Sequence, residues 1–85
     1  MGFEDFLTAE DKITALNEMR RAMFAELYTL CIRANIDPDT VDYDTWTMPE
    51  QQPENHNTFH FMGVIDRICE SIRIIDGKIG KIENV

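Results

Sequence analysis

Apolar side chains recur at alternating spacings of three and four residues through the first third of the chain. This first stripe consists of Ile13, Leu16, Arg20, Met23, Leu27, Leu30 and Ala34, of which Arg20 is the one charged member. The period is that of one face of an α-helix. Thr8 and Asp11 form an aspartate variant of the capping box that begins helices, while Asn35 and Pro38 favour an end to the helix. We therefore expect a helix over residues 9–35.

A second pattern follows four-three spacing without a break toward the C-terminal end. This isoleucine stripe consists of Phe61, Ile65, Ile68, Ile72, Ile75, Ile79 and Ile82. It matches the a and d positions of a coiled coil over three heptads, and isoleucine at both positions favours three or four strands over two. Gly77 and Gly80 each cost about 1 kcal/mol inside a helix, and Asp76-Gly77 is a turn signal, so an end near Gly77 is the alternative. We expect one helix over residues 58–83.

The segment between the predicted helices, residues 36–57, is acidic. It contains three prolines and six carboxylates, and it has no lysine or arginine. Pro38 suits the first position of a helix, so Asp37 and Pro38 predict a single capped helical turn at the start of the segment. A structureless connection of this length is unusual in a compact domain, which indicates that the segment packs against the helices.

Five residues of this segment are candidates for binding a partner protein: Asp39, Asp42, Tyr43, Asp44 and Trp46. Tyrosine and tryptophan are frequent anchors of protein interfaces, and neighbouring carboxylates steer association with a basic surface. The alternative, which we favour, is that both aromatic side chains pack as a lid over the helical pair. The two interpretations predict different exposure for Trp46, the only tryptophan of the chain.

The two predicted helices share one apolar interface, and each has apolar residues left over, namely Met19, Phe24, Val64 and Ile74. A chain of this size also buries only about 60% of the surface that its unfolded form exposes. We therefore expect one domain (residues 1–85) with an all-α fold, an antiparallel two-helix hairpin with an acidic connecting loop. Homo-oligomerisation through the isoleucine stripe, as a coiled coil or helical bundle, would complete the core, with a trimer ahead of a dimer.

The charge balance limits the classes of partner. Sixteen acidic and eight basic residues give a net charge of −8. Direct binding to nucleic acid or to an anionic membrane surface is not expected, whereas a basic protein surface is a favourable partner. The first residues are acidic and lack the apolar region of a signal peptide, and no apolar run approaches the roughly 18 residues of a membrane span. We expect a soluble, cytoplasmic protein.

Candidate metal ligands do not reach a diagnostic pattern. His56 and His60 have the spacing of two ligands on one helical face, with Glu54 nearby, but no third ligand has the spacing of a known site. The aspartates of the loop do not fit a calcium loop, because Val41 stands where a fifth-position oxygen ligand is needed. We interpret these residues as polar surface, and we expect neither a metal nor a cofactor.

Three polar or reactive side chains fall within the predicted apolar faces. Cys31 and Cys69 are expected as reduced core thiols, because helices that fold back from a common bend place Cys31 opposite Met62, about two turns from Cys69. Buried thiols are poor nucleophiles, and only Arg33, Arg67 and Arg73 offer positive charge near them in the sequence, so we expect no catalytic activity. Arg20 is expected to extend to the edge of its helix or, if it is buried, to pair with a carboxylate.

These observations predict a non-enzymatic structural or adaptor protein, a small assembly subunit that self-associates through the isoleucine stripe. The alternative is an acidic inhibitor or regulator that binds a basic surface of another protein, for example a nucleic-acid-binding one, through the aspartates and aromatic residues of the loop. A third reading is a helical bundle that binds a small ligand, and only the architecture supports it.

Overall fold

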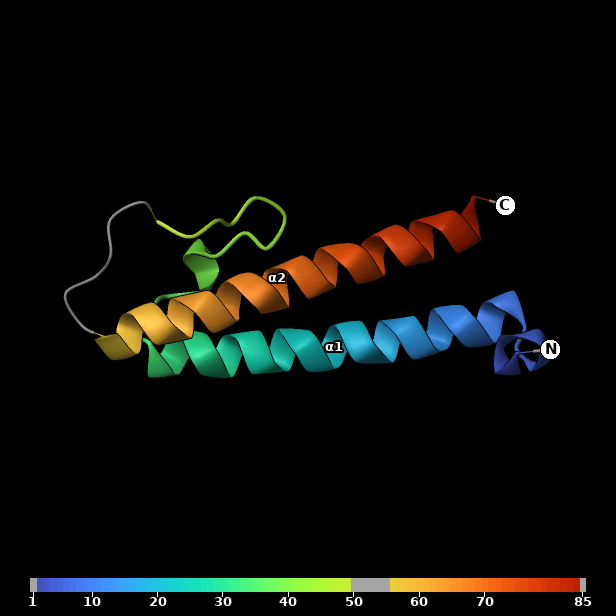
Figure 1. Ribbon diagram of the computed structural model, residues 1–85, viewed down its shortest axis with the longest axis horizontal. Helices are drawn as coiled ribbons and strands as arrows, with labels where there is room; N and C mark the ends of the chain where they lie inside the picture. The colour runs from blue at the N-terminus through green and yellow to red at the C-terminus, as the bar shows by residue number, and fades with distance from the viewer. Residues whose placement is uncertain (1, 50–55, 85) are drawn as a thin grey trace.

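Two long helices lie side by side and run antiparallel (Figure 1). The computed structural model describes residues 2–49 and 56–84, except for the side chains of residues 56 and 57. The long helices are α1 (Ala9–Arg33) and α2 (His56–Glu83), and two short 3-10 helices, η1 (Phe3–Phe6) and η2 (Pro38–Thr40), precede α1 and follow it. The described residues contain no strand. The chain is therefore an all-α helical hairpin, as the two apolar stripes predict.

The start of α1 is fixed by the predicted capping box. The Thr8 hydroxyl accepts a hydrogen bond from the Asp11 amide at 3.0 Å, and the Asp11 carboxylate accepts one from the Thr8 amide at 3.1 Å. These two bonds satisfy N–H groups that have no partner in the first turn of a helix. The capping prediction is confirmed.

The end of α1 is a left-handed turn at Asn35, whose φ angle is 58°. The amide of Ile36 donates to the Cys31 carbonyl at 2.8 Å and the amide of Asn35 donates to the Ile32 carbonyl at 3.2 Å. This is the Schellman pattern, in which asparagine is tolerated at the left-handed position. Asn35 therefore ends the helix from just outside it, which places the last helical residue at Arg33 instead of residue 35.

Helix α2 continues through both of its late glycines to Glu83. A Cβ atom at Gly77 or Gly80 would have no neighbouring atom within 4 Å, so packing does not require glycine at either position. Burial of the preceding isoleucines offsets the helix cost of these residues. The alternative end near Gly77 is not seen.

The buried core lies where the C-terminal part of α1 meets the first half of α2. Its main cluster consists of Leu27, Leu30, Cys31, Ile65, Ile68, Cys69 and Ile72. Arg20 contacts Asp76 at 2.7 Å, and in an antiparallel pair this contact brings Cys31 roughly level with Ile65, about one turn from Cys69. The expected register, with Cys31 opposite Met62, assumed a common bend, whereas the long connection lets the helices slide. Both thiols are free and buried.

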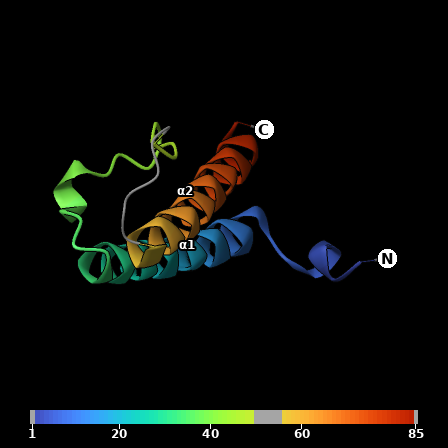
Figure 2. The ribbon, with the colours of Figure 1, turned by 60° about the vertical axis from the view of Figure 1, so that its left-hand side comes forward.

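The hairpin is elongated. Its extents are 50 × 25 × 20 Å and its radius of gyration is 15.7 Å, whereas a compact domain of this length has a radius near 12 Å. Residues 36–49 lie on one side of the helix pair (Figure 2), and η1 and the last turns of α2 lie at the end of the hairpin far from the core, where η1 projects away from the helices. Among the described residues, no helix combines the length and apolar character needed to cross a bilayer.

Candidate functional site

The first part of the connecting segment is a capped 3-10 turn, as its sequence predicts. The Asp37 carboxylate accepts a hydrogen bond from the Asp39 amide at 3.0 Å, and Pro38 occupies the first turn of η2. Proline suits this position because its ring presets the backbone and it has no N–H to satisfy. The turn directs residues 41–49, called the loop below, back over the helices.

A second turn is built on Asp42. Its carboxylate accepts a hydrogen bond from the Asp44 amide at 3.0 Å, and its carbonyl oxygen accepts one from the Trp46 amide at 2.8 Å. Aspartate is favoured in turns because its short side chain bonds the backbone two residues later. Asp42 therefore both contributes charge and sets the path of the loop.

Tyr43 packs its ring against α1. The ring stands edge-on to that of Phe24, with centroids 5.1 Å apart and planes at 82°. Its hydroxyl accepts a hydrogen bond from Nη2 of Arg20 at 3.0 Å. Tyr43 and Trp46 are both half-buried and pack against the core cluster, which is the arrangement of a lid.

Arg20 joins both helices and the loop. Its Nε donates to Oδ1 of Asp76 at 2.7 Å, and its guanidinium carbon lies 4.8 Å from the centre of the Phe24 ring. The hydrogen bond to Asp76 raises the pKa of Arg20; partial burial opposes this shift and the bond to Tyr43 adds to it. Both side chains of the ion pair are 34% exposed, so the pair contributes at most about 1 kcal/mol. The main effect of this ion pair is to fix the position of α1 relative to α2.

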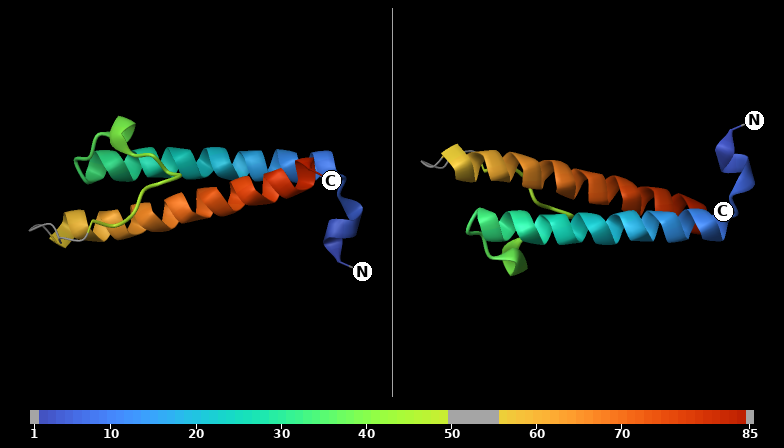
Figure 3. Two further views of the ribbon diagram at one scale, coloured as in Figure 1. Left: turned by 90° about the horizontal axis from the view of Figure 1, so that it is seen from above. Right: turned by 90° about the horizontal axis from the view of Figure 1, so that it is seen from below.

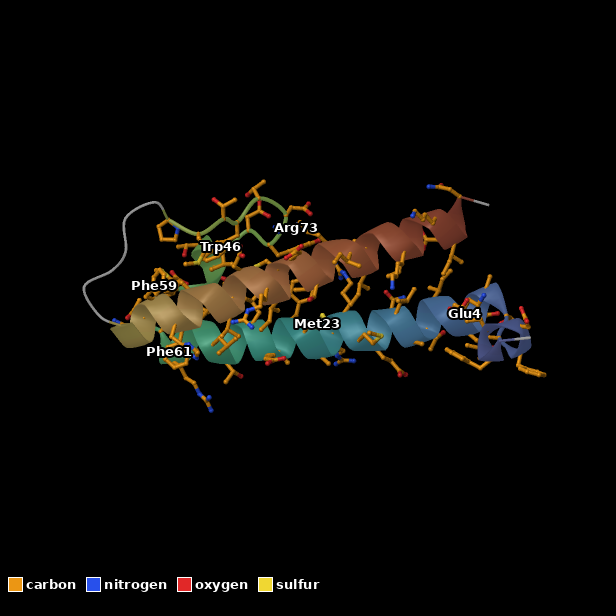
Figure 4. All side chains as sticks on the ribbon, in the orientation of Figure 1. Glu4, Met23, Trp46, Phe59, Phe61 and Arg73 are labelled. Carbon is orange, nitrogen blue, oxygen red and sulfur yellow. The ribbon has the colours of Figure 1, made fainter. Side chains whose placement is uncertain are left out.

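Arg73 of α2 holds the backbone of the loop. Its Nη1 donates to the carbonyl oxygen of Tyr43 at 2.8 Å and, more weakly, to that of Trp46 at 3.4 Å. Figure 4 shows Trp46 and Arg73 on the side of α2 that the loop covers. Carbonyl groups removed from water need such a donor, and a charged donor makes the stronger bond.

The acidic side chains of the site point to solvent. Asp39, Asp42 and Asp44 are all exposed, and none forms an ion pair with another described residue. The loop itself has no lysine or arginine. The structure thus brings the five predicted partner-binding residues into one short region, with the carboxylates outward and the aromatic rings partly inward.

The isoleucine stripe lies mostly inside the hairpin. The exposed fractions of Ile65, Ile68, Ile72 and Ile75 are between 0 and 8%, because α1 and the loop cover them. The remaining members of the predicted oligomer interface are half-buried, namely Phe61, Ile79 and Ile82. A second chain would reach only the two ends of the stripe.

The other residues considered for chemistry show no reactive arrangement. Cys31 and Cys69 have no exposed surface, and burial raises the pKa of both thiols, which keeps them protonated. His60 is exposed, while Glu54 and the side chain of His56 lie outside the described residues. Over residues 2–49 and 58–84, no three His, Cys, Asp or Glu side chains are grouped as metal ligands.

Two residues that position the loop were not identified from the sequence. In the sequence, Arg73 has no feature that sets it apart from the surface positions of α2, and Asp76 is interpreted only as part of a turn signal with Gly77. A signal for Arg73 was present: the loop has no cation of its own, so a donor for its carbonyl groups had to come from a helix. The pairing of Asp76 with Arg20 required the register of the two helices, which the sequence does not specify.

No protein-family model matches the chain, and neither a curated protein nor a solved structure shows significant similarity to it. The class of the protein is therefore defined by its own geometry. It is a helical hairpin with an acidic loop bound across one face.

Proposed function

We propose that the chain is a non-enzymatic binding module whose acidic loop docks on a basic surface of another protein. The observation that carries this proposal is the Arg73 contact. It holds the backbone at Tyr43 and Trp46 while the aspartates beside them remain exposed. The chemistry of the site is charge presentation, and a nucleic-acid-binding protein is one class with a suitable surface.

The ordered path of the loop supports binding because it lowers the entropy that association would cost. Ordering a flexible side chain or loop on binding costs about 0.5–1.5 kcal/mol per side chain. In this chain, turns at Asp37 and Asp42 and the contact from Arg73 order the loop before any partner arrives. The net charge of −8 adds long-range attraction to a cationic partner and speeds encounter.

Burial of the isoleucine stripe is the reason for placing this function ahead of self-assembly through that stripe. The argument for the stripe as an interface was apolar surface left over on the two helices. Its four central isoleucines are at most 8% exposed in the single chain, so they offer little further surface to bury.

The test replaces the three exposed aspartates by asparagine, as Asp39→Asn, Asp42→Asn and Asp44→Asn together. Of these three side chains only that of Asp42 accepts a backbone hydrogen bond of a turn, and asparagine keeps an oxygen for it, so the change removes charge and retains the path of the loop. The matched control changes three exposed glutamates of the helices by the same net charge, with Glu18→Gln, Glu26→Gln and Glu70→Gln.

The unaltered chain, the loop variant and the control are each immobilised, and the proteins that each retains from a cell extract are quantified. The protein that the unaltered chain retains in the largest amount is then purified, and its association kinetics are measured. We expect the unaltered chain and the control to retain the same basic protein, and the loop variant to associate at least about tenfold more slowly at low salt. Equal association rates for the loop variant and the control would show that the loop is not the binding surface.

A further inference from the structure

An open groove lies where the end of α1 meets η2, and we call it the α1–η2 groove. It forms because the left-handed backbone at Asn35 turns the chain so that η2 packs beside α1. Figure 3 shows η2 next to the last turns of α1, on the side away from α2. The volume of the groove is about 370 Å³. Its walls are formed by Ile32, Asn35, Ile36, Asp37 and Pro38.

An exposed apolar strip of α1 leads into this groove. Tyr28 and Ile32 are 59% and 56% exposed, and their spacing of four residues places them on one face of the helix. Ala25 is exposed and lies on the same face, one turn before Tyr28. We call these three residues the strip, and Ile36 and Pro38 continue its apolar surface past the end of α1. Large apolar side chains grouped in this way mark a binding surface.

Carboxylates outnumber cations around the strip and the groove. Residues 21–49 contain five carboxylates and two cations, Arg21 and Arg33. Four of these carboxylates follow Arg33, and the next lysine or arginine in the chain is Arg67. Asp37 lines the groove, Asp39 follows it in η2, and both are exposed. The partial negative charge at the C-terminal end of α1 adds to this field. The groove thus combines apolar walls with an acidic rim.

We infer that the strip and the α1–η2 groove bind an amphipathic basic helix of the partner protein. Apolar side chains of that helix pack on Tyr28 and Ile32, where the small side chain of Ala25 allows close approach. A lysine or arginine at its edge places its carbon chain in the groove and its charge beside Asp37 and Asp39. Such side chains bury an apolar stem while the charged tip stays in water, which matches apolar walls with an acidic rim. The inference rests on the proposed function, because it names the kind of surface on which the acidic loop docks.

A partner helix fits this surface better than a small ligand or a second copy of the chain. Sites for small ligands enclose most of the ligand surface, whereas this groove is open. An amphipathic helix needs only an apolar groove for one of its faces. A second copy would have to offer a basic helical segment, but residues 4–12 and 78–83, which hold all three lysines, also contain five carboxylates.

The strip and the loop contribute differently to binding. The exposed aspartates of the loop attract a cationic partner over a distance, and salt screens this attraction. Burial of the strip acts only at contact, and it does not depend on the ionic strength in the same way. The salt dependence of binding therefore separates the contribution of the groove from that of the loop.

The test measures the binding of a defined basic helix. The probe is a synthetic peptide of about 18 residues that contains only leucine and lysine, with the leucines on one helical face and a fluorescent dye at one end. Its dissociation constant is measured by fluorescence anisotropy at low salt. We expect the unaltered chain to bind this peptide. Ile32→Ser should bind it at least about fivefold more weakly, because serine removes the apolar contact at the groove. Isoleucine and serine have similar helix propensities, so α1 should remain helical.

Ile74→Ser is the matched control. Ile74 of α2 is 53% exposed and lies outside the strip, so this change removes the same side chain at a similar exposure. It should leave the dissociation constant unchanged. A second peptide, with glutamine in place of every leucine, keeps the charge and removes the apolar face, and it should bind the unaltered chain at least about tenfold more weakly. Circular dichroism checks that both variants remain helical.

Asp37→Asn tests the acidic rim separately. Asparagine keeps an oxygen for the hydrogen bond from the Asp39 amide, so η2 should retain its cap. Binding of the leucine–lysine peptide should weaken about two- to fivefold at low salt. This effect should disappear at about 0.5 M salt, whereas the effect of Ile32→Ser should remain.

The inference is overturned if the unaltered chain does not bind the leucine–lysine peptide, if Ile32→Ser and Ile74→Ser bind it equally, or if the glutamine peptide binds as tightly. The loop variant with three asparagines separates this failure from a failure of the proposed function. If that variant binds the peptide more weakly than the control with three substituted glutamates while Ile32→Ser has no effect, only the inference about the groove is wrong. If Ile32→Ser weakens binding and the loop variant does not, the groove is the binding surface and the proposed role of the loop is wrong.

Discussion

Replacing Arg73 with methionine removes both hydrogen bonds to the carbonyl groups of the loop and keeps an unbranched apolar side chain in place. The 2.8 Å bond to the Tyr43 carbonyl has a charged donor, and bonds of this kind contribute about 1.5–3 kcal/mol. The 3.4 Å bond to the Trp46 carbonyl adds little because of its length. Arg73 is half-buried, so solvent screens part of this contribution, and about 1–2 kcal/mol is the expected loss. The population of chains with a detached loop should then rise about 5- to 30-fold.

Trp46 reports this change directly, because it is the only tryptophan and lies in the loop. Arg73→Met should shift its emission to longer wavelength and increase its quenching by acrylamide, while the circular dichroism of the helices stays the same. Arg67→Met is the matched control, an exposed arginine of the same helix whose side chain has no hydrogen bond to a described residue. If both variants give the same emission and quenching, Arg73 does not hold the loop.

Three further predictions concern stability. Ile72 has no exposed surface, so Ile72→Ala should lower the free energy of unfolding in urea by about 2–5 kcal/mol, whereas Ile74→Ala, at a site 53% exposed, should cost less than about 1 kcal/mol; similar losses would contradict the described core. Because burial raises the pKa of Cys31 and Cys69, the unfolded chain releases these protons at lower pH than the folded chain does. The two protonated thiols should contribute fully to the free energy of unfolding below about pH 8.5. Above that pH, the free energy of unfolding should fall by up to about 1.4 kcal/mol per pH unit for each thiol. Urea unfolding at several pH values should show this slope, and replacing both cysteines by alanine should remove it. The left-handed backbone at Asn35 predicts that Asn35→Ala lowers the melting temperature, by a loss of about 1 kcal/mol, and that Asn35→Gly does not; equal melting temperatures would argue against the turn.

The ends of α1 could be predicted because they depend on residues close together in the chain. Thr8 and Asp11 bond one another across three residues, and Asn35 adopts its left-handed backbone where the helix meets Ile36. Such local interactions are determined by side-chain chemistry that sequence reasoning reads directly. The same holds for the capped turn at Asp37.

Contacts between distant residues could not be predicted in the same way. Arg20 and Asp76 are separated by 56 residues, and Arg73 and Tyr43 by 30. Their meeting depends on how far α2 slides along α1, and a long connection leaves that distance open. The wrong prediction that Cys31 lies opposite Met62 has the same origin.

The periodicity of the isoleucines predicted which face of α2 is buried, but it could not identify what buries that face. Ile65 and Ile72 have no exposed surface within one chain, since the loop and α1 both pack over them. A heptad pattern reports only the need for an apolar partner. Whether that partner is the same chain or another depends on the path of the loop.

The atoms that accept hydrogen bonds from Arg73 are main-chain carbonyl oxygens, and every type of residue supplies such an oxygen. The contact from Arg73 therefore does not depend on the side chains of residues 44, 45 and 47, whereas Asp42 is kept because its carboxylate forms a turn of the loop. Residues 44, 45 and 47 are exposed and can be randomised without removing the guanidinium contact. The hairpin is for this reason a compact scaffold for selecting new binding loops, in which one arginine on a helix anchors a variable sequence.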